Sequence, residues 1–394
     1  MVDLEFKTEN NTLTVFLSGH VDTSNAGEIE QKINEKLAEG KYNAMVFDCE
    51  KLTYISSAGL RIFMRIKKAI PDTSAINVNN DVYDIFDITG FTEILEVKKA
   101  YRVISVDGCE VIGQGANGKV YRIDPETIVK VYLNPDALPD IQRERELART
   151  AFVLGIPTAI PYDVVRIEGG GYGSVFELLN ATSFAKLLMR GEKTVDEVAK
   201  MSIDLLKLIH STVVKPGSMP DMKTVALKWA SDLKPYLPEE QAEKLCSLIA
   251  AVPDDNHMMH GDYHIKNVML QNGESLLIDM DTICHGNPVF EFASMFNAYV
   301  GYSSLDHEVV LKFLGIPYEQ TAKLWHKSLE LYLGTTDENR IKEVEEKAMI
   351  VGYTRMMRRT IRRHGFDTEE GRATIEYCKN MLSELLSRTD TLIF

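Results

Sequence analysis

The spacing of apolar residues changes several times within the first hundred residues. LEFKT and TLTVFLSG alternate apolar and polar positions on either side of Asn10 and Asn11, which predicts a β-hairpin. After the capping candidates Thr23 and Ser24, residues 26–37 repeat apolar positions at helical spacing and predict an amphipathic helix. The segments that follow predict, in order, a strand at YNAMVFDC, a helix in YISSAGLRIFMRIKKAI, a strand at SAINVNN and a short helix at VYDIFDITG. Together these elements indicate a small mixed α/β domain.

Beyond this domain the pattern indicates a larger region in two parts. Strands dominate from Val111 to about Thr182, around one helix at DIQRERELARTAFVLG. From Ala185 onward helical periodicity prevails, except across the hairpin in HGDYHIKNVMLQNGESLLIDMD. We predict one domain at residues 1–100 and a second at 101–394, with an N-lobe at about 101–180 and a helical C-lobe at about 181–394.

Composition narrows the class of protein. Hydrophobic residues at 45% and charged residues at 26% are ordinary for a soluble protein, and no run approaches the roughly 18 apolar residues that a bilayer span requires. The N-terminus, MVDLEFKTEN, lacks the basic and apolar segments of a signal peptide. Five scattered cysteines without a CxxC pair argue against a disulfide framework and a zinc site. We therefore expect a cytoplasmic protein that does not associate with membranes.

The balance of charge disfavours nucleic acid as a partner. Lys and Arg together number 44 against 58 for Asp and Glu, which gives a net charge of −14 and repels phosphate backbones. The one concentrated basic run is RMMRRTIRR, from Arg355 to Arg363. Its helical spacing is typical of a solvated helix face, and the sequence assigns it no role.

The segment VIGQGANGKVYRI places a GxGxxG pattern between two strands, with glycines at Gly113, Gly115 and Gly118. Dinucleotide-binding loops with this spacing open a helix, whereas KVYRI alternates and continues as a strand, so that interpretation is disfavoured. A glycine-rich hairpin lets backbone N–H groups approach phosphates closely, because no Cβ blocks the approach. We predict that these glycines cradle the phosphates of a nucleotide.

The next strand, TIVKVY, carries Lys130 among apolar residues. A lysine in such a strand is costly unless its ammonium has partners, which nucleotide phosphates and a helix carboxylate would supply. The following helix offers Glu144 and Glu146. Glu144 is preferred because Leu147 and Ala148 follow at i+3 and i+4 and place it beside the buried face, while Glu146 stays open.

The segment HGDYHIKN places Asp262 five positions before Asn267. This is the separation in the kinase catalytic loop, where the aspartate handles the substrate hydroxyl and the asparagine binds a metal. The strand SLLIDMD then delivers Asp279, which with Asn267 predicts a Mg²⁺ site, because hard oxygen ligands suit that ion. Asp281 is left open between a second metal ligand and a turn cap. With the glycine-rich hairpin upstream, these residues predict Mg²⁺-dependent phosphoryl transfer, with Asp262 as base or substrate-positioning group.

HGDYHIKN, with Gly261 in second place, and the later IDMDTICHGNPVFEFA resemble the aminoglycoside phosphotransferase and choline kinase superfamily, whose motif is approximately HGDLHxxN. The resemblance covers about residues 104–390 and implies a bilobal protein-kinase-like fold that uses ATP or GTP. It also implies an adenine-binding hinge near Phe176 and Leu178, and a structural acid at Glu291. Members of the superfamily act on aminoglycosides, choline, sugars, amino alcohols and occasionally proteins.

LTYISSAGLRIFMRIKK, followed by a strand and IFDITGF, resembles the STAS domain of anti-sigma-factor antagonists over residues 3 to about 98. In that family a serine before the helix is phosphorylated to release a partner, which implies an anti-sigma-like protein partner. Ser57 takes the phosphorylated position, while Ser56 stands where the family commonly has aspartate. The alternative for these serines is plain capping of the helix N-terminus.

The chain is therefore expected to be an α/β plus α+β protein, with a STAS-like α/β domain before a bilobal kinase-like fold. Its expected activity is Mg²⁺-dependent transfer of a nucleotide γ-phosphate to a hydroxyl of a small-molecule acceptor, with the STAS domain for regulation or partner docking. Two alternatives are a nucleotide-sensing regulatory protein and a kinase acting on a STAS-domain serine. The intact Asp262 weighs against a pure sensor. The long helical C-terminal region, which in the superfamily builds a small-molecule cleft, weighs against a protein kinase.

Overall fold

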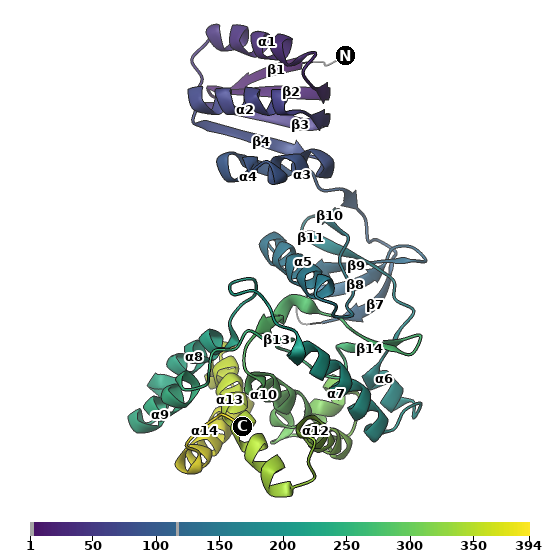
Figure 1. The fold of residues 1–394 in the computed structure, drawn as a ribbon, viewed down its shortest axis with the longest axis vertical. Coiled ribbons are helices and arrows are strands. Elements are labelled where there is room, and N and C mark those ends of the chain that lie inside the picture. The colour runs from purple at the N-terminus through teal and green to yellow at the C-terminus, as the bar shows by residue number, and fades with distance from the viewer. Residues whose placement is uncertain (1–3, 116–117) are drawn as a thin grey trace. The chain divides into compact units, whose positions relative to one another are not determined.

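The computed structural model describes residues 4–115 and 118–394, whose path is drawn in Figure 1. The chain divides into two compact units. The first consists of Met1–Asp107 with Val164–Gly170, and the second of Gly108–Asp163 with Gly171–Phe394. Each unit has its own cluster of buried apolar side chains, as expected for a chain too long for one hydrophobic core.

The first unit is built on a five-stranded sheet in the order β1-β2-β3-β4-β5. The strands are β1 (Leu4–Glu9), β2 (Thr12–Val21), β3 (Ala44–Ile55), β4 (Asp72–Val78) and β5 (Glu96–Lys99). Strands β1 and β2 are antiparallel, whereas β2, β3, β4 and β5 pair in parallel. Asn10 and Asn11 form the turn with φ of 48° and 61°, a conformation that asparagine adopts readily, and the predicted hairpin is confirmed.

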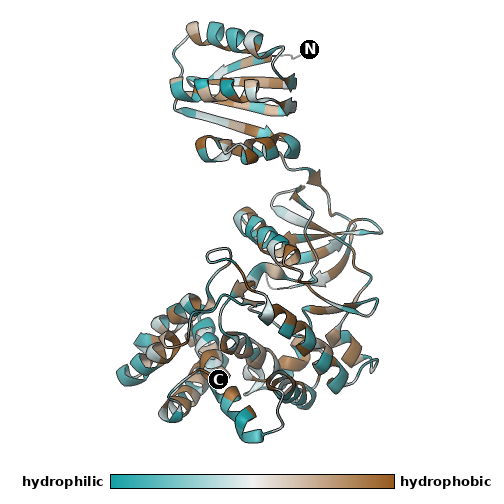
Figure 2. Ribbon diagram, viewed as in Figure 1, coloured by the Kyte–Doolittle hydropathy of each residue, from teal (hydrophilic) through white to brown (hydrophobic). Residues whose placement is uncertain are grey.

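Helices α1 (Ala26–Ala38), α2 (Ser57–Ala69), α3 (Asn80–Ile88) and α4 (Phe91–Ile94) accompany this sheet. Teal and brown residues alternate along α1 and α2 in Figure 2, as in amphipathic helices. The N-cap of α1 is Asn25, without a side-chain cap bond, so the prediction of Thr23 or Ser24 as cap is wrong. Ser24 Oγ instead donates to Asp22 Oδ1 at 2.6 Å, which keeps it in the preceding turn.

In the second unit, four strands form an antiparallel arrangement in the order β11-β9-β8-β7. They are β7 (Glu110–Gln114), β8 (Gly118–Arg122), β9 (Thr127–Tyr132) and β11 (Tyr172–Glu177). Helix α5 (Leu138–Val153) contacts β11 and buries Glu144 together with Leu147 and Ala148. Strands β6 (Val103–Ile104) and β10 (Asp163–Ile167) pair in parallel and, apart from Asp163, belong to the first unit.

The rest of the second unit is mainly helical, which confirms the predicted change of pattern after residue 185. Its α-helices are α6 (Phe184–Met189), α7 (Val195–Ser211), α8 (Met222–Leu233), α9 (Glu239–Ala250), α10 (Pro288–Tyr299), α11 (Glu308–Leu314), α12 (Tyr318–Leu333), α13 (Glu338–Arg362) and α14 (Glu369–Arg388). Strands β12 (Thr182–Ser183), β14 (Val268–Gln271) and β15 (Glu274–Leu277) form one small sheet, and β13 (Met258–Met259) pairs with β16 (Cys284–His285). Helix α10 is buried along most of its length and packs on α13.

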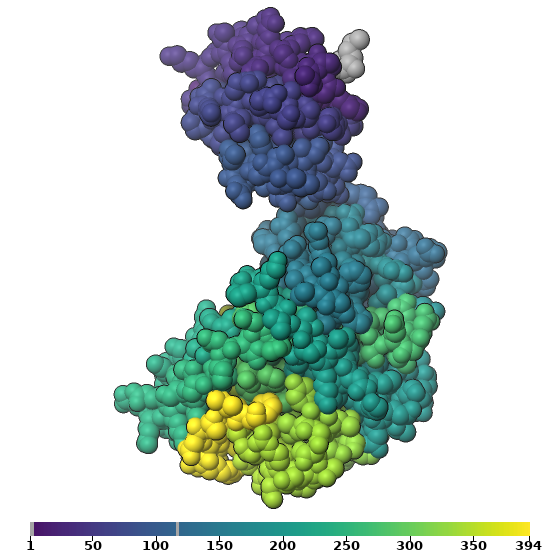
Figure 3. Space-filling model, viewed as in Figure 1, coloured from purple at the N-terminus to yellow at the C-terminus, as the bar shows by residue number. Residues whose placement is uncertain are grey.

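The C-terminal helices close this unit. Helices α13 and α14 pack against each other, and the last residues, yellow in Figure 3, form a continuous surface with the yellow-green residues before them. The Lys347 ammonium donates to the Ile393 carbonyl at 2.6 Å and fixes the end of the chain.

Among the helices of residues 4–115 and 118–394, none combines the length and apolar character needed to cross a bilayer. All five cysteines are free thiols.

Candidate active site

A cavity of about 1250 Å³ within the second unit brings most of the predicted site residues together. Those lining it are Gly113, Gly115, Gly118, Lys130, Glu144, Phe176, Leu178, Asp262, Asn267 and Asp279. They come from strands β7, β8, β9 and β11 and the residues beside them, from α5 and from the segment around the β14–β15 hairpin. The remaining candidate, Ser57, belongs to the first unit.

The three glycines of the β7–β8 hairpin differ in what the fold asks of them. A Cβ on Gly118 would lie 2.3 Å from the carbonyl oxygen of Val131, so the packing of β8 on β9 requires glycine there. At Gly115 a Cβ would meet no atom within 4 Å, although the residue lines the cavity. The Gly115 N–H donates to the Gly118 carbonyl at 2.9 Å and is used within the turn. Sheet packing thus explains Gly118, while Gly115 leaves open space on the cavity side.

Lys130 is held between two carboxylates. Its ammonium lies 3.0 Å from Glu144 Oε1 and 2.8 Å from Asp279 Oδ1. Glu144 is buried and also accepts a hydrogen bond from the Tyr132 hydroxyl at 2.5 Å, whereas Glu146 is exposed. Of the two glutamates left open by the sequence, the structure pairs Glu144 with Lys130. Burial acts to lower the pKa of Lys130, but the charges of Asp279 and Glu144 outweigh it and hold that pKa above its ordinary value.

The end of the β14–β15 hairpin sets the positions of the predicted metal ligands. The Ile278 N–H donates to the Asn267 carbonyl at 3.0 Å, so Asp279 leaves the hairpin beside Asn267, with a positive φ of 64°. The amide nitrogen of Asn267 donates to the Asp262 carbonyl at 3.1 Å, which leaves its amide oxygen as the atom for a ligand. Burial, and then the charge of Asp279, raise the pKa of the neighbouring Asp281 to about 7.

Asp262 is surrounded by groups that stabilise its charged form. Its Oδ1 lies 3.5 Å from Arg355 Nη2 and accepts from Ser294 Oγ at 3.5 Å, while its Oδ2 lies 3.5 Å from His264 Nε2. Burial opposes ionisation, but the contact with His264 and the charges of Arg355 and His260 outweigh it and hold the pKa of Asp262 well below its ordinary range. The site therefore presents a carboxylate that can accept a hydrogen bond from a hydroxyl.

Arg355 is a residue of the candidate site that sequence reasoning missed. Its Nη1 donates to the Gly261 carbonyl at 3.1 Å and to Ser294 Oγ at 2.9 Å, so it ties α13 to the loop that carries Asp262. The guanidinium also lies over the Trp229 ring, 5.5 Å from its centroid. The interpretation of RMMRRTIRR as a solvated helix face is wrong for this residue. Arginines repeated at i, i+4 and i+8 along the run were the signal that could have found it.

Glu291 holds the backbone of the loop that carries Asp262. Its carboxylate is fully buried and accepts from the backbone N–H groups of His260 at 2.6 Å and Gly261 at 3.1 Å, and its Oε2 lies 3.7 Å from His210 Nε2. Burial acts to raise the pKa of Glu291, but the contact with His210, the charge of His260 and the backbone N–H of Gly261 hold it below its ordinary value. Gly261 has a φ of 78°, and a Cβ there would lie 2.4 Å from the Thr282 carbonyl oxygen. The backbone conformation and this contact both require glycine.

Family models match both units. The model described as "Phosphotransferase enzyme family" matches residues 108–317, and the model described as "STAS domain" matches residues 3–103. The chain belongs to the phosphotransferase enzyme family. This phosphotransferase carries an N-terminal STAS domain, and its predicted fold class is confirmed: a STAS-like α/β domain followed by a protein-kinase-like fold.

The comparisons with individual proteins divide along the same line. The STAS region is 30% identical over 89 residues to BtrV of Bordetella bronchiseptica, named as an anti-sigma factor antagonist, and the match covers 22% of this chain and 76% of BtrV. The aminoglycoside phosphotransferase APH(4)-Ia, solved with AMP-PNP and hygromycin B, is 12% identical with a TM-score of 0.49, over 72% of this chain and 94% of that one. A choline/ethanolamine kinase family protein from Mesorhizobium loti is 13% identical with a TM-score of 0.47, over 72% and 90% of the two chains.

The predicted hinge of the phosphotransferase lines the cavity between apolar walls. Phe176 is the second-last residue of β11, and the Leu178 N–H, just beyond this strand, donates to the Glu126 carbonyl at 2.7 Å. The Leu178 N–H is thus used within the protein, so a base at this hinge would depend on other backbone groups. The apolar residues around it are Ile112, Val120, Ile128, Ala148, Met269 and Ile278. Such walls suit a flat aromatic base.

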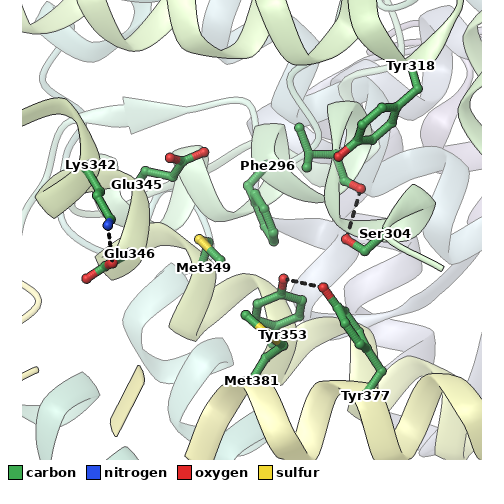
Figure 4. Close-up of a pocket in the computed structure, with 11 residues that line it drawn as sticks. Phe296, Ser304, Tyr318, Lys342, Glu345, Glu346, Met349, Tyr353, Tyr377 and Met381 are labelled. Atoms are coloured by element: carbon green, nitrogen blue, oxygen red, sulfur yellow. Dashed lines mark hydrogen bonds and ion pairs between the residues drawn. The ribbon is translucent and has the colours of Figure 1, made fainter. Parts of the chain in front are cut away.

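A second hollow of about 350 Å³ adjoins the cavity and shares Tyr377 with it. Figure 4 shows its aromatic side chains, with the Tyr353 and Tyr377 hydroxyls 3.4 Å apart. Glu345 also lines it and accepts from the Trp325 indole N–H at 2.7 Å, and burial raises the pKa of this glutamate. The lining of this side pocket, all of it within the described residues, includes none of the predicted phosphate-handling residues.

Proposed function

We propose that this phosphotransferase transfers the γ-phosphate of ATP or GTP to a hydroxyl of a small molecule in a Mg²⁺-dependent reaction. The observation that carries this proposal is that one cavity contains the Lys130 ammonium, paired with Glu144 and Asp279, together with the charged Asp262. The five free thiols and the nucleotide substrate favour action in the cytoplasm.

The nucleotide would occupy the side of the cavity formed by strands β7, β8, β9 and β11. The β7–β8 hairpin and Lys130 would hold its phosphates, and the segment from Phe176 to Leu178 its base. Asn267 and Asp279 would hold Mg²⁺, because both offer oxygen atoms to the same cavity. A bound Mg²⁺ ion supplies positive charge that neutralises the phosphates.

The acceptor hydroxyl would lie at Asp262. The oxygen of the acceptor hydroxyl forms a bond to the γ-phosphorus. The bond between the γ-phosphorus and the oxygen that bridges it to the β-phosphorus breaks, so that the nucleoside diphosphate leaves. The hydroxyl proton passes to the Asp262 carboxylate. Arg355 and Ser294 hold this carboxylate through the contacts at 3.5 Å, and a low pKa suits a group that mainly orients the hydroxyl.

The size of the cavity supports a small-molecule acceptor. Its volume of about 1250 Å³ exceeds the roughly 300–1000 Å³ typical of a site for one ligand. Residues of α10, α13 and α14 line the part beyond Asp262. This part offers room for an acceptor beside the nucleotide.

The STAS domain would dock an anti-sigma-like protein partner through the loop before α2. Ser56 is the N-cap of this helix and accepts from the Ala58 N–H at 3.2 Å. Ser57 stands at the first helical position with an exposed side chain. A phosphate on Ser57 would be stabilised by the free N–H groups of the first turn and would add charge to a surface suited to a neutral hydroxyl. We propose that such a phosphate weakens docking.

A nucleotide-consumption screen tests the proposed function. The purified full chain is incubated with labelled MgATP or MgGTP and a panel of hydroxyl-bearing small molecules. Phosphate on a small molecule supports the proposal, and phosphate on Ser57 would make the chain a protein kinase instead. Tight nucleotide binding without transfer to any acceptor would make it a nucleotide sensor.

A further inference from the structure

The part of the cavity beyond Asp262 is basic. Among its lining residues after position 290, the charged side chains are Arg355, Arg359, Arg363 and Glu370. The three arginines follow one another at i, i+4 and i+8. Arg355 and Arg359 therefore share one face of α13, and Arg363 is the C-cap residue of this helix. The chain as a whole carries a net charge of −14, so this surface reverses the overall charge locally.

The arginines on this face differ in how far the protein uses them. Arg355 is committed to Gly261, Ser294 and Asp262, as described above. Arg359 donates one hydrogen bond, to the Tyr302 hydroxyl at 3.0 Å, and lies over that ring at 5.2 Å.

Arg359 and Arg363 retain unpaired donors on the side of the cavity. Within residues 4–115 and 118–394, neither Arg359 nor Arg363 has a carboxylate partner, so most of the five N–H donors of each guanidinium remain for a ligand. Arg358, on another face of the helix, is instead paired with Asp232.

We propose that the acceptor carries an anionic group, a phosphate or a carboxylate, that binds Arg359 and Arg363 while its reacting hydroxyl lies at Asp262. This inference rests on the proposed phosphotransfer and names its substrate class. Guanidinium groups bind both anions through two parallel hydrogen bonds. The helical rise places Arg359 roughly 6 Å and Arg363 roughly 12 Å from Arg355 along the axis. The hydroxyl and the anion would accordingly be separated by a chain of several carbon atoms.

The same face disfavours cationic acceptors. An ammonium group in this part of the cavity would meet the positive charges of Arg359 and Arg363, against the single carboxylate of Glu370. The side pocket offers Glu345 and Glu346 among aromatic rings, which would suit a cation, but Asp262 does not line it. A cation held there would not bring its hydroxyl to the predicted phosphotransfer site.

The experiment compares matched acceptors and matched arginines. D-ribose 5-phosphate is tested against D-ribose, D-gluconate against D-glucose, and both pairs against choline and kanamycin, in nucleotide-consumption assays with MgATP. The variants are Arg359→Gln with Arg363→Gln, and as control Arg362→Gln, an exposed arginine of the same helix that does not line the cavity. We expect turnover with an anionic compound, a rise of at least about tenfold in its KM in the double variant, and little change in kcat or in the KM for ATP, since uniform binding energy is lost.

Other results overturn the proposal. They are preference for a neutral or cationic acceptor, an unchanged acceptor KM in the double variant, or an equal effect of Arg362→Gln. A lower Tm with unchanged KM would mean that the arginines only complement the C-terminus of α13.

If no compound is turned over, calorimetry with the anionic compounds and AMP-PNP separates the two proposals. Binding to the wild-type chain that is lost in the double variant would support the anion site and contradict the proposed phosphotransfer. No binding at millimolar concentration would remove the anion site.

Discussion

The Lys130 ammonium lies 2.8 Å from Asp279 Oδ1, although the two residues are 149 positions apart in the chain. The contact joins β9 of the β11-β9-β8-β7 strands to the end of the β14–β15 hairpin, on the wall of the cavity. Glu144 completes the arrangement from α5. One carboxylate 14 positions away and another 149 positions away thus flank this ammonium, which is the group expected to meet the nucleotide phosphates.

Replacing this lysine tests its role separately from its contribution to stability. Lys130→Met should lower turnover about 100-fold by misplacing the phosphates. It should also cost about 3 kcal/mol of stability, because it leaves the buried Glu144 carboxylate without its cation. Adding Glu144→Gln should restore much of the stability, measured by urea unfolding, without restoring turnover. Full activity in the double variant would show that Lys130 serves packing alone.

Asp262→Asn should lower kcat by roughly 10²–10⁴-fold while leaving the affinity for nucleotide nearly unchanged, because the carboxylate acts on the acceptor hydroxyl. Steady-state kinetics and a separate nucleotide titration measure the two quantities. The pKa of Asp262 is held below its ordinary value of 3.8, so the carboxylate stays ionised as pH falls toward that value. An acidic limb in kcat/KM well above this value that disappears in Asp262→Asn would contradict the lowered pKa, and an unchanged kcat in this variant would remove Asp262 from the reaction.

Asp279→Ala should abolish the Mg²⁺-dependent part of nucleotide binding, since the variant removes a predicted oxygen ligand. Calorimetric titration with ATP, with and without Mg²⁺, measures that part directly. Asp281→Asn, measured alongside, distinguishes a second metal ligand from a turn residue. Unchanged MgATP affinity in Asp279→Ala would remove the residue from the metal site.

Two glycines with positive φ offer a matched test of the loop geometry. Gly273→Ala should cost about 1 kcal/mol, because φ is 86° but a Cβ would meet open space. Gly261→Ala should cost substantially more and also lower activity, since its Cβ would lie 2.4 Å from the Thr282 carbonyl oxygen. Chemical denaturation of the two variants gives the comparison. Equal losses would mean that the loop adjusts at little cost.

Variants of Ser56 and Ser57, at the start of α2, should distinguish a helix cap from a phosphorylation switch. Ser56→Ala should destabilise α2 by about 1 kcal/mol, seen as faster hydrogen exchange of its amides, because the bond to the Ala58 N–H is lost. Ser57→Ala should change little, since its side chain is exposed. Ser57→Asp should leave the helix folded, as acids are favoured in a first turn, yet weaken capture of an anti-sigma-like partner. Unchanged capture would leave the STAS domain as a scaffold.

Much of the protein could be predicted from local sequence because the responsible interactions are local. The alternation of apolar and polar residues around Asn10 and Asn11 was enough to predict the first hairpin, since asparagine tolerates the positive φ of such a turn. The separation of Asp262 and Asn267 sufficed for the predicted loop, because the hydrogen bond between them spans only five positions. Both features depend on chain geometry over a few residues.

Contacts between distant segments were decided only by the tertiary structure. Spacing on α5 favoured Glu144 but could not exclude Glu146, because the choice depends on which side chain faces β9. Arg355 looked like part of a solvated helix face until packing brought it within 3.5 Å of Asp262, 93 positions away. Helical periodicity tells which residues share a face but not what covers that face, and burial against the loop turns an ordinary arginine into part of the site.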